Sequence, residues 1–226
     1  MAWLHNTQKL DDSMVTMTSV SISEFSLGVV ILAAGLSTRM GRPKLLLPWR
    51  DTSVLGHALQ TWAGLDVGQI AVVCATGAPE IHAELDRLRF DSADRIMNPQ
   101  PEKGMFSSIQ CAARWSNWRS SLSHFAIVLG DQPHLRRKTL GQLLDFAAAN
   151  PQKICQPLRG GRRRHPVILP CGAFLKLRAT VAGDLSQFLN STPGVLTGLE
   201  LDDPGLDLDL DSPADYERAK ALAESC

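Results

Sequence analysis

The stretch that decides the fold is residues 29–49, which read VVILAAGLSTRMGRPKLLLPW. It opens on an apolar run at residues 29–34, whose length and β-branched content are typical of a strand buried on both faces. The run ends at Gly35, and a polar, basic loop follows as far as Lys44. The stretch therefore predicts a buried strand that leads directly into a cationic loop.

The loop from Gly35 to Lys44 is built from groups that bind phosphate. Its glycines let the backbone approach a ligand closely and point successive N–H groups at one anion. Arg39 can hold two oxygens with its planar guanidinium, and Lys44 adds a mobile point charge. The spacing matches neither the P-loop nor the dinucleotide-binding fingerprint. From the residues alone, the loop is either a phosphate site or an ordinary turn with solvated charges.

Apolar strands and amphipathic helices alternate after this loop. Strands are predicted at residues 69–75, 95–98 and 125–129, and helices at residues 54–65, 79–89, 105–115 and 140–149. This alternation predicts an α/β, three-layer, Rossmann-like fold, in which helices flank a mostly parallel sheet. Ligands of such sheets bind at the carboxyl ends of the strands, where both the 35–44 loop and the turn at residues 130–133 fall.

The last third of the chain has a different pattern. Strands predicted at residues 153–157 and 165–169 enclose a basic hairpin, RGGRRR, and helices near 173–177 and 184–189 precede a strand at 195–202. Residues 206–211, LDLDLD, alternate strictly, which predicts a strand with Asp207, Asp209 and Asp211 on one face. Ser212 and Pro213 predict the N-cap and the first residue of a final helix.

Length, charge and cysteine usage limit the class of protein. The chain has 226 residues, enough for one α/β domain, and its first 27 residues are polar and lack periodicity. We expect a mobile N-terminal extension over residues 1–27 and a single domain over residues 28–226. With 23 basic and 23 acidic residues, no global field favours nucleic acid or a membrane. Five cysteines without metal or disulfide spacing favour a cytoplasmic location.

Acidic residues near the predicted sheet edge suggest a metal site. Asp131 follows a buried strand in the turn GDQP, where its carboxylate either binds Mg²⁺ or caps the following helix. One or two acids of the 206–211 strand could complete a magnesium site facing Asp131. The alternative for these acids is a solvated edge strand, which we favour for Asp207.

Three motifs together resemble those of the MobA-like NTP transferase family. Residues 32–44 match its signature loop, LAAGxSxRMGxxK, and are most similar to the molybdenum cofactor cytidylyltransferase (MocA-like) branch. Residues 130–133 resemble its Gly-Asp-x-Pro motif, and residues 209–213 its Asp-x-Asp-Thr-Pro motif, with Ser in place of Thr. The resemblance implies the nucleotide-diphospho-sugar-transferase-like fold and Mg²⁺-dependent transfer of a nucleotide from an NTP to a phosphorylated acceptor, with release of pyrophosphate.

The resemblance also implies roles for individual residues. It implies catalytic roles for Arg39, Lys44 and Asp131, and magnesium ligation by Asp131, Asp211 and Asp209. His165 and Pro166 match a Gly-His-Pro motif and are implied on the acceptor side. Nucleotide contacts are implied for Leu32, Ala33, Ala34, Gly35, Ser37, Thr38, Arg39, Met40, Gly41, Lys44, Thr76, Asn98, Gly104, Met105 and Ser108. From the residues alone, Ser107 and Ser108 could equally be ordinary first-turn residues of a helix.

The donor and acceptor rest on finer details. Ala33-Ala34-Gly35 resembles the cytidylyl branch, whereas the guanylyl branch tends to carry Ala-Gly-Gly, so CTP is expected over GTP. A molybdopterin-type cofactor is the expected acceptor, with a molybdoenzyme as client. Arg164 and residues 183–187 depart from the family's patterns, Gly-His-Pro and Gly-Asp-x-Gly-Ala, on the expected acceptor side. The basic hairpin either binds an anionic acceptor or is simply exposed.

Two alternatives stay open. Within the same chemistry, the donor could be GTP, or the acceptor a sugar or polyol phosphate. In a different class, the chain could be a nucleotide-binding maturation partner that hands a cofactor to a molybdoenzyme without turnover.

Overall fold

The computed structural model describes residues 25–35, 43–192 and 194–224. The expected extension lies outside the described residues as far as residue 24, and its outcome stays a prediction. The first strand, β1, begins at Leu27. Most of the cationic loop also lies outside the described residues, including Ser37, Thr38, Arg39, Met40 and Gly41.

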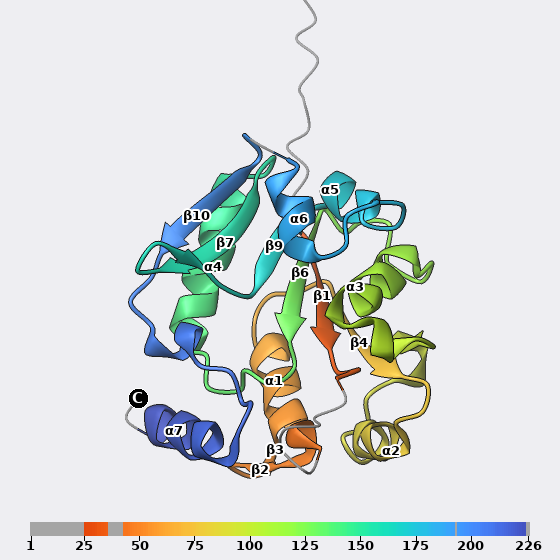
Figure 1. The fold of residues 1–226 in the computed structure, drawn as a ribbon, viewed down its shortest axis with the longest axis vertical. Coiled ribbons are helices and arrows are strands. Elements are labelled where there is room, and N and C mark those ends of the chain that lie inside the picture. Colours follow the sequence, from red (N-terminus) through yellow and green to blue (C-terminus); the bar gives the residue numbers. More distant parts are fainter. Residues whose placement is uncertain (1–24, 36–42, 193, 225–226) are drawn as a thin grey trace, which may run out of the picture.

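An eight-stranded sheet forms the centre of the molecule (Figure 1). Its order is β10-β7-β9-β6-β1-β4-β5, with β8 paired to β7. The strands are β1 (Leu27–Leu32), β4 (Gln69–Ala75), β5 (Arg95–Asn98), β6 (His124–Leu129), β7 (Ile154–Arg159), β8 (Arg162–Arg163), β9 (Val167–Pro170) and β10 (Leu196–Glu200). β1 is parallel to β4 and β6, whereas β9 is antiparallel to both of its long neighbours. The predicted mostly parallel sheet is confirmed.

The predicted helices are also present. They are α1 (Val54–Ala63), α2 (Pro79–Arg87), α3 (Met105–Arg114), α4 (Arg137–Ala149), α5 (Cys171–Lys176), α6 (Leu185–Asn190) and α7 (Pro213–Glu224). Short elements complete the list: β2 (Pro48–Trp49), β3 (Thr52–Ser53), and the 3-10 helices η2 (Lys44–Leu46), η3 (Ser92–Asp94), η4 (Pro101–Lys103) and η5 (Pro204–Asp207). Ser53 caps α1, since its hydroxyl accepts a hydrogen bond from the Gly56 N–H at 2.9 Å.

Successive residues of β1 pack on opposite faces of the sheet, which creates three layers. Val29 and Ile31 belong to a core formed with side chains of α1, α2, α4 and α7. Val30 belongs to a second core formed with α3, α5 and α6. Because both faces are covered by apolar helix faces, the first five residues of β1 are buried, as its unbroken apolar run predicts, and Leu32 at its end is half-buried.

The predicted strand at residues 206–211 is wrong. Residues 204–207 form η5, and residues 208–211 have no regular structure. The Asp203 side chain accepts a hydrogen bond from the Gly205 N–H at 2.9 Å, which starts a turn in place of a strand. Leu206 and Leu210 are still buried, so the alternation reports core contacts without strand pairing. The three acids consequently do not share one face of a strand.

Candidate active site

A cavity of about 370 Å³ lies at the carboxyl ends of β1 and β6. Its walls come from the end of β1, the start of η2, the loop before α3 and the turn after β6. The lining residues are Leu32, Ala34, Gly35, Lys44, Leu45, Pro101, Glu102, Gly104, Met105, Ser108, Leu129 and Asp131. The structure thus brings the described part of the cationic loop and Asp131 to one cavity, at the edge of the sheet where ligands are expected.

Gly130 sets the position of Asp131. Its N–H donates to the Leu32 carbonyl at 3.1 Å, so the end of β6 lies tightly against the end of β1. A Cβ at Gly130 would lie 2.7 Å from the Leu32 carbonyl oxygen, closer than any side chain tolerates. Only glycine therefore allows this approach. The next residue, Asp131, then lines the cavity with a side chain that is 14% exposed.

Lys44 contacts carboxylates from two distant parts of the chain. Its Nζ lies 2.5 Å from Asp131 Oδ2 and 3.2 Å from Asp211 Oδ1. Burial acts to lower the pKa of Lys44, but attraction and hydrogen bonds from Asp131 and Asp211 outweigh it, and the pKa is raised. Lys44 is therefore a protonated cation held between two carboxylates.

This arrangement fits a hard divalent cation. Mg²⁺ is usually bound by one or two carboxylates, with substrate phosphates and water as its other ligands. Asp131 and Asp211 are close enough for one cation to contact both. In the described ranges, no group of three or more His, Cys, Asp or Glu side chains is placed to hold a metal. A metal here would thus depend on substrate oxygens.

Asp209 has a different partner from Asp211. Its Oδ1 accepts a hydrogen bond from Gln132 Nε2 at 3.1 Å. The residues after β6 therefore contact both acids of the Asp-x-Asp segment, Asp211 through the bridging Lys44 and Asp209 through Gln132. Asp207, for which the solvated alternative was favoured, pairs with Arg164 at 2.5 Å and with Arg159 at 3.1 Å. Asp207 and two arginines of the 159–164 segment thus form one ion-pair cluster.

The loop before α3 is held by Asn98, which is 1% exposed. Its Nδ2 donates to the hydroxyls of Ser107 and Ser108 at 2.9 Å each, and its Oδ1 accepts from the Gln100 N–H at 2.9 Å. Ser108 lines the cavity, whereas Asn98 lies behind it. The Asn98 side chain therefore positions the start of α3, and both its Nδ2 and its Oδ1 already have hydrogen-bond partners within the protein.

Two of the predicted nucleotide contacts, Thr76 and Ala33, have other surroundings in the fold. Thr76 donates through its N–H and its hydroxyl to the Asn98 carbonyl, at 3.1 and 3.3 Å. Ala33 is 1% exposed and packs into the core under the sheet. Neither residue is among those that line the cavity.

His165 lies beside β6, outside the residues that line the cavity. Its Nδ1 is 3.5 Å from the Ile127 carbonyl oxygen, and the His165–Pro166 peptide bond is cis. Burial lowers the pKa of His165, while Asp209 and Asp131 act in the opposite direction. His165 is thus near enough to the acidic groups to interact with them electrostatically.

The family model for the MobA-like NTP transferase domain matches residues 29–195. The chain belongs to this family. Its nucleotidyltransferase fold, expected from the signature loop and the two acidic motifs, is confirmed, and α7 with the Asp209–Asp211 segment follows the matched region.

Relatives support the same family. The molybdenum cofactor cytidylyltransferase of Escherichia coli K12 is 27% identical over 194 residues, which cover 84% of this chain and 94% of that protein. The crystal structure of Rv0371c from Mycobacterium tuberculosis H37Rv is 27% identical, with a TM-score of 0.73 over 87% of this chain and 98% of that one. A structure of Rv0371c in complex with manganese is 26% identical, with a TM-score of 0.66 over 89% and 100% of the two chains.

A buried acid that the sequence did not single out links the two acidic segments of this NTP transferase. Asp203 is 1% exposed and accepts hydrogen bonds from Thr139 Oγ1 at 2.6 Å and from the Arg136 N–H at 3.4 Å. His134 Nε2 is 3.0 Å from the Gly205 carbonyl oxygen. These contacts fix the segment that carries Asp209 and Asp211 against the loop that follows Asp131. The Asp-Pro-Gly turn was the available signal, since it marks a side chain that bonds its own backbone.

Proposed function

We propose that this chain transfers CMP from CTP to a phosphorylated acceptor, a molybdopterin-type cofactor, with Mg²⁺ as the metal and release of pyrophosphate. The observation that carries the proposal is the contact of the Lys44 ammonium with Asp131, which lines the same cavity, and with Asp211. Basic and acidic groups meet there, as is required to bind a triphosphate together with a divalent ion.

The proposed reaction is displacement at the α-phosphorus. An acceptor phosphate oxygen forms a new bond to the α-phosphorus, and the bond to the bridging oxygen breaks as pyrophosphate leaves with that electron pair. Since the attacking oxygen is already an anion, no general base is needed. The chain supplies alignment and charge neutralisation.

Each charged residue has a distinct proposed role. Asp131 and Asp211 would hold the metal, with Asp209 as a further candidate ligand. Bound Mg²⁺ would neutralise charge on the α-phosphate and the acceptor. Lys44 then exchanges its carboxylate partners for oxygens of the leaving pyrophosphate. Arg39, which lies outside the described residues, is proposed to bind the same phosphates.

The nucleoside is proposed to lie on the side of the cavity formed by Gly104, Met105 and Ser108. Gly104 has φ +84, a conformation that glycine adopts without strain, and it allows the chain to turn directly into α3. Ala34, which also lines the cavity, carries a methyl group that is proposed to narrow the space for the base. The E. coli relative is a cytidylyltransferase, which supports CTP over GTP.

The acceptor is proposed to enter on the side of His165 and Pro166, and a molybdoenzyme to receive the product. The name of the E. coli relative supports a molybdenum cofactor as acceptor. The cytoplasm is the proposed compartment, since the cysteines of the described chain, Cys74, Cys111, Cys155 and Cys171, are all free thiols.

The test is pyrophosphate release by the purified chain with Mg²⁺, a molybdopterin-type acceptor and either CTP or GTP. We expect release with CTP to exceed release with GTP at least tenfold. Lys44→Ala should reduce release about 100-fold, the usual cost of removing one group that stabilises transition-state charge. Lys176→Ala, which removes an exposed lysine from α5, is the matched control. Wild-type release unchanged by Lys44→Ala would contradict the proposed role.

A further inference from the structure

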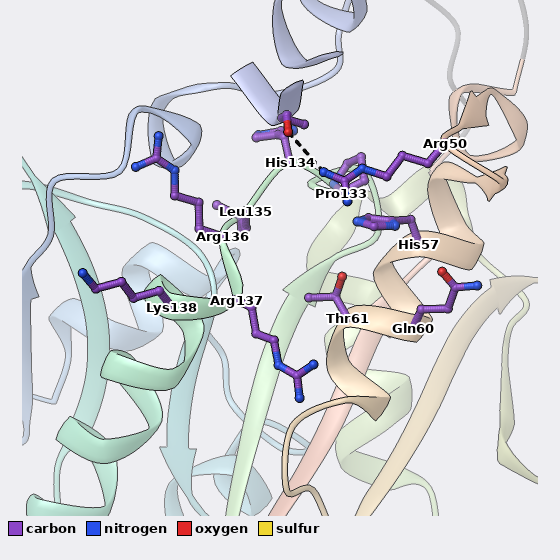
Figure 2. Close-up of a pocket in the computed structure, with 11 residues that line it drawn as sticks. Arg50, His57, Gln60, Thr61, Pro133, His134, Leu135, Arg136, Arg137 and Lys138 are labelled. Carbon is purple, nitrogen blue, oxygen red and sulfur yellow. Dashed lines mark hydrogen bonds between the residues drawn. The ribbon is translucent and has the colours of Figure 1, made fainter. Parts of the chain in front are cut away.

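A second and larger hollow lies outside the proposed active site. Its volume is about 680 Å³, and it is bounded by α1, by residues 133–138 at the start of α4, by the β2–β3 turn and by the end of α7 (Figure 2). It shares no lining residue with the cavity that contains Lys44 and Asp131. Its volume lies within the range of small-molecule sites.

The lining of this hollow is strongly cationic. Four side chains, Arg50, Arg136, Arg137 and Lys138, contribute positive charge, and none of the eleven lining residues is acidic. Within the described residues, Arg50, Arg137 and Lys138 form no ion pair, and Arg136 has only a 4.0 Å contact with Asp203. Because the chain as a whole has no net charge, this excess is local.

Two arginines approach the hollow from opposite sides. Arg50 has φ +52, in the left-handed region that a non-glycine residue seldom adopts, and its Nη2 donates to the Ala223 carbonyl at 3.1 Å. The guanidinium of Arg137 lies against the end of α1, where a Cβ at Gly64 would be 2.9 Å from Nη1. In Figure 2, Arg137 extends from α4 toward the α1 side of the hollow, below Thr61. The guanidinium groups of Arg50 and Arg137 thus reach the hollow from two different elements, the β2–β3 turn and α4.

His57 lies between these arginines on α1. Its ring contacts Trp49, at 6.2 Å between ring centres, and Figure 2 shows it beside Pro133 and below Arg50. Burial, followed by the charge of Arg50, lowers the pKa of His57. With its pKa lowered, the His57 imidazole is a polar group in this wall that can donate or accept a hydrogen bond.

We infer that this hollow binds a small molecule with two or more phosphate groups. Three of its four cations are arginines, whose planar guanidinium groups match phosphate oxygens in pairs. The rest of the lining could contact the part of such a ligand that carries no phosphate. It includes the polar side chains of Gln60 and Thr61 and the apolar side chains of Pro133 and Leu135. Asp131 lies two residues before Pro133, so the loop that carries this proposed metal ligand also contributes to the lining of the hollow.

The first test uses the wild-type chain and needs no variant. Inorganic pyrophosphate, without divalent metal, is titrated while ¹H–¹⁵N NMR follows backbone amides. We expect saturable shifts at Gln60, Thr61, Arg137 and Lys138. Shifts confined to Gly35, Lys44 and Asp131 would place the anion in the proposed active-site cavity and overturn the inference. Cytidine diphosphate is the second probe: equal affinity identifies the diphosphate group alone as the ligand, and tighter binding identifies a nucleoside diphosphate.

The second test separates the two cavities by calorimetry. Pyrophosphate affinity should persist in Lys44→Ala and fall at least tenfold in Arg50→Gln/Arg137→Gln. The matched control is Arg114→Gln/Lys176→Gln, which removes two positive charges from α3 and α5, including an arginine that also donates to a backbone carbonyl. An equal loss in the control, or tighter binding of hexaglutamate than of pyrophosphate, would overturn the inference, the latter in favour of an acidic protein partner.

Discussion

The Thr139 hydroxyl donates to the buried carboxylate of Asp203 at 2.6 Å, across 64 residues of sequence. This bond joins the first turn of α4 to the segment that ends in Asp209 and Asp211. α4 also follows the loop that carries Asp131. The two acidic segments of the proposed metal site therefore share one buried anchor, although neither is part of a strand at that point.

Removal of this anchor should weaken both the fold and the site. Asp203→Ala leaves the Thr139 hydroxyl and the Gly205 N–H without their acceptor, and hydrogen bonds to charged groups are worth about 1.5–3 kcal/mol each. We expect the free energy of unfolding to fall by about 3 kcal/mol in urea denaturation. The neighbouring Asp202→Ala is the control, because the Asp202 side chain is 100% exposed. Equal stability of the two variants would contradict the anchor.

A methyl group at Gly130 should separate catalytic damage from general instability. In Gly130→Ala the new Cβ meets the Leu32 carbonyl, so the ends of β1 and β6 must move apart and Asp131 with them. Overpacking of this kind costs about 1–3 kcal/mol. We expect pyrophosphate release to fall at least tenfold at a temperature where the variant is fully folded by circular dichroism.

Gly141→Ala is the control for this substitution. Gly141 lies within α4, and no heavy atom lies within 4 Å of a Cβ built there. Alanine in a helix interior is favoured over glycine by about 1 kcal/mol, so the melting temperature should rise with release unchanged. A Gly130→Ala chain with wild-type activity would show that Asp131 does not depend on this close approach.

The central strands could be predicted because burial on both faces leaves an unbroken apolar run. Gln69–Ala75 and Arg95–Asn98 have the bounds that the sequence predicts. Alternation with helices predicts mostly parallel pairing, but it predicts neither the order of the strands nor the antiparallel β9, since an antiparallel strand within a parallel sheet leaves no local mark. At residues 206–211, in contrast, the sequence predicts a strand that the structure does not contain. Their leucines alternate toward the core, yet strand formation also needs a neighbouring strand, which no local pattern reveals.

The site was predictable to the extent that its residues lie next to strand ends. Asp131 and Gly35 follow buried strands, so both could be placed at one edge of the sheet. The partner of Lys44 could not be derived from spacing, because Asp211 is 167 residues away and reaches Lys44 through an irregular segment. Asp203 was missed for the same reason, since its partners lie on α4.

Stability should decrease as the solution becomes acidic, because buried histidines resist protonation. Burial lowers the pKa of His124 and His134 below the ordinary value of 6.5. Their contribution is therefore complete above pH 6.5 and is lost as the pH falls through their lowered pKa values. Each such histidine adds a slope of up to about 1.4 kcal/mol per pH unit.

His124→Gln tests this pH dependence. The His124 ring is 4% exposed, and its Nε2 is 3.0 Å from the Pro151 carbonyl oxygen, a contact that a glutamine amide can replace. Urea denaturation between pH 7.5 and pH 5 should show a shallower loss of stability in the variant than in the wild type. An identical slope in both chains would remove His124 from the explanation.

The Lys44 ammonium should compete with a divalent ion for the same two carboxylates. Lys44 contacts Asp131 and Asp211, and its pKa is raised, so it stays charged at neutral pH. A metal that enters must displace this cation. We therefore expect Lys44→Ala to bind Mn²⁺ more tightly than the wild type, at least threefold by calorimetry, while its rate of pyrophosphate release falls.

Removing a carboxylate instead of the lysine tests whether Asp211 itself contributes to Mn²⁺ binding. Asp211→Asn removes one anionic ligand and one partner of Lys44, so Mn²⁺ affinity should decrease, and Lys44→Ala/Asp211→Asn should bind no more tightly than the wild type. Asp202→Asn, an exposed acid of the same segment, should leave the affinity unchanged. If Lys44→Ala weakened Mn²⁺ binding, the lysine would be supporting the metal site by orienting Asp131 and Asp211, and the exchange of partners proposed for catalysis would be wrong.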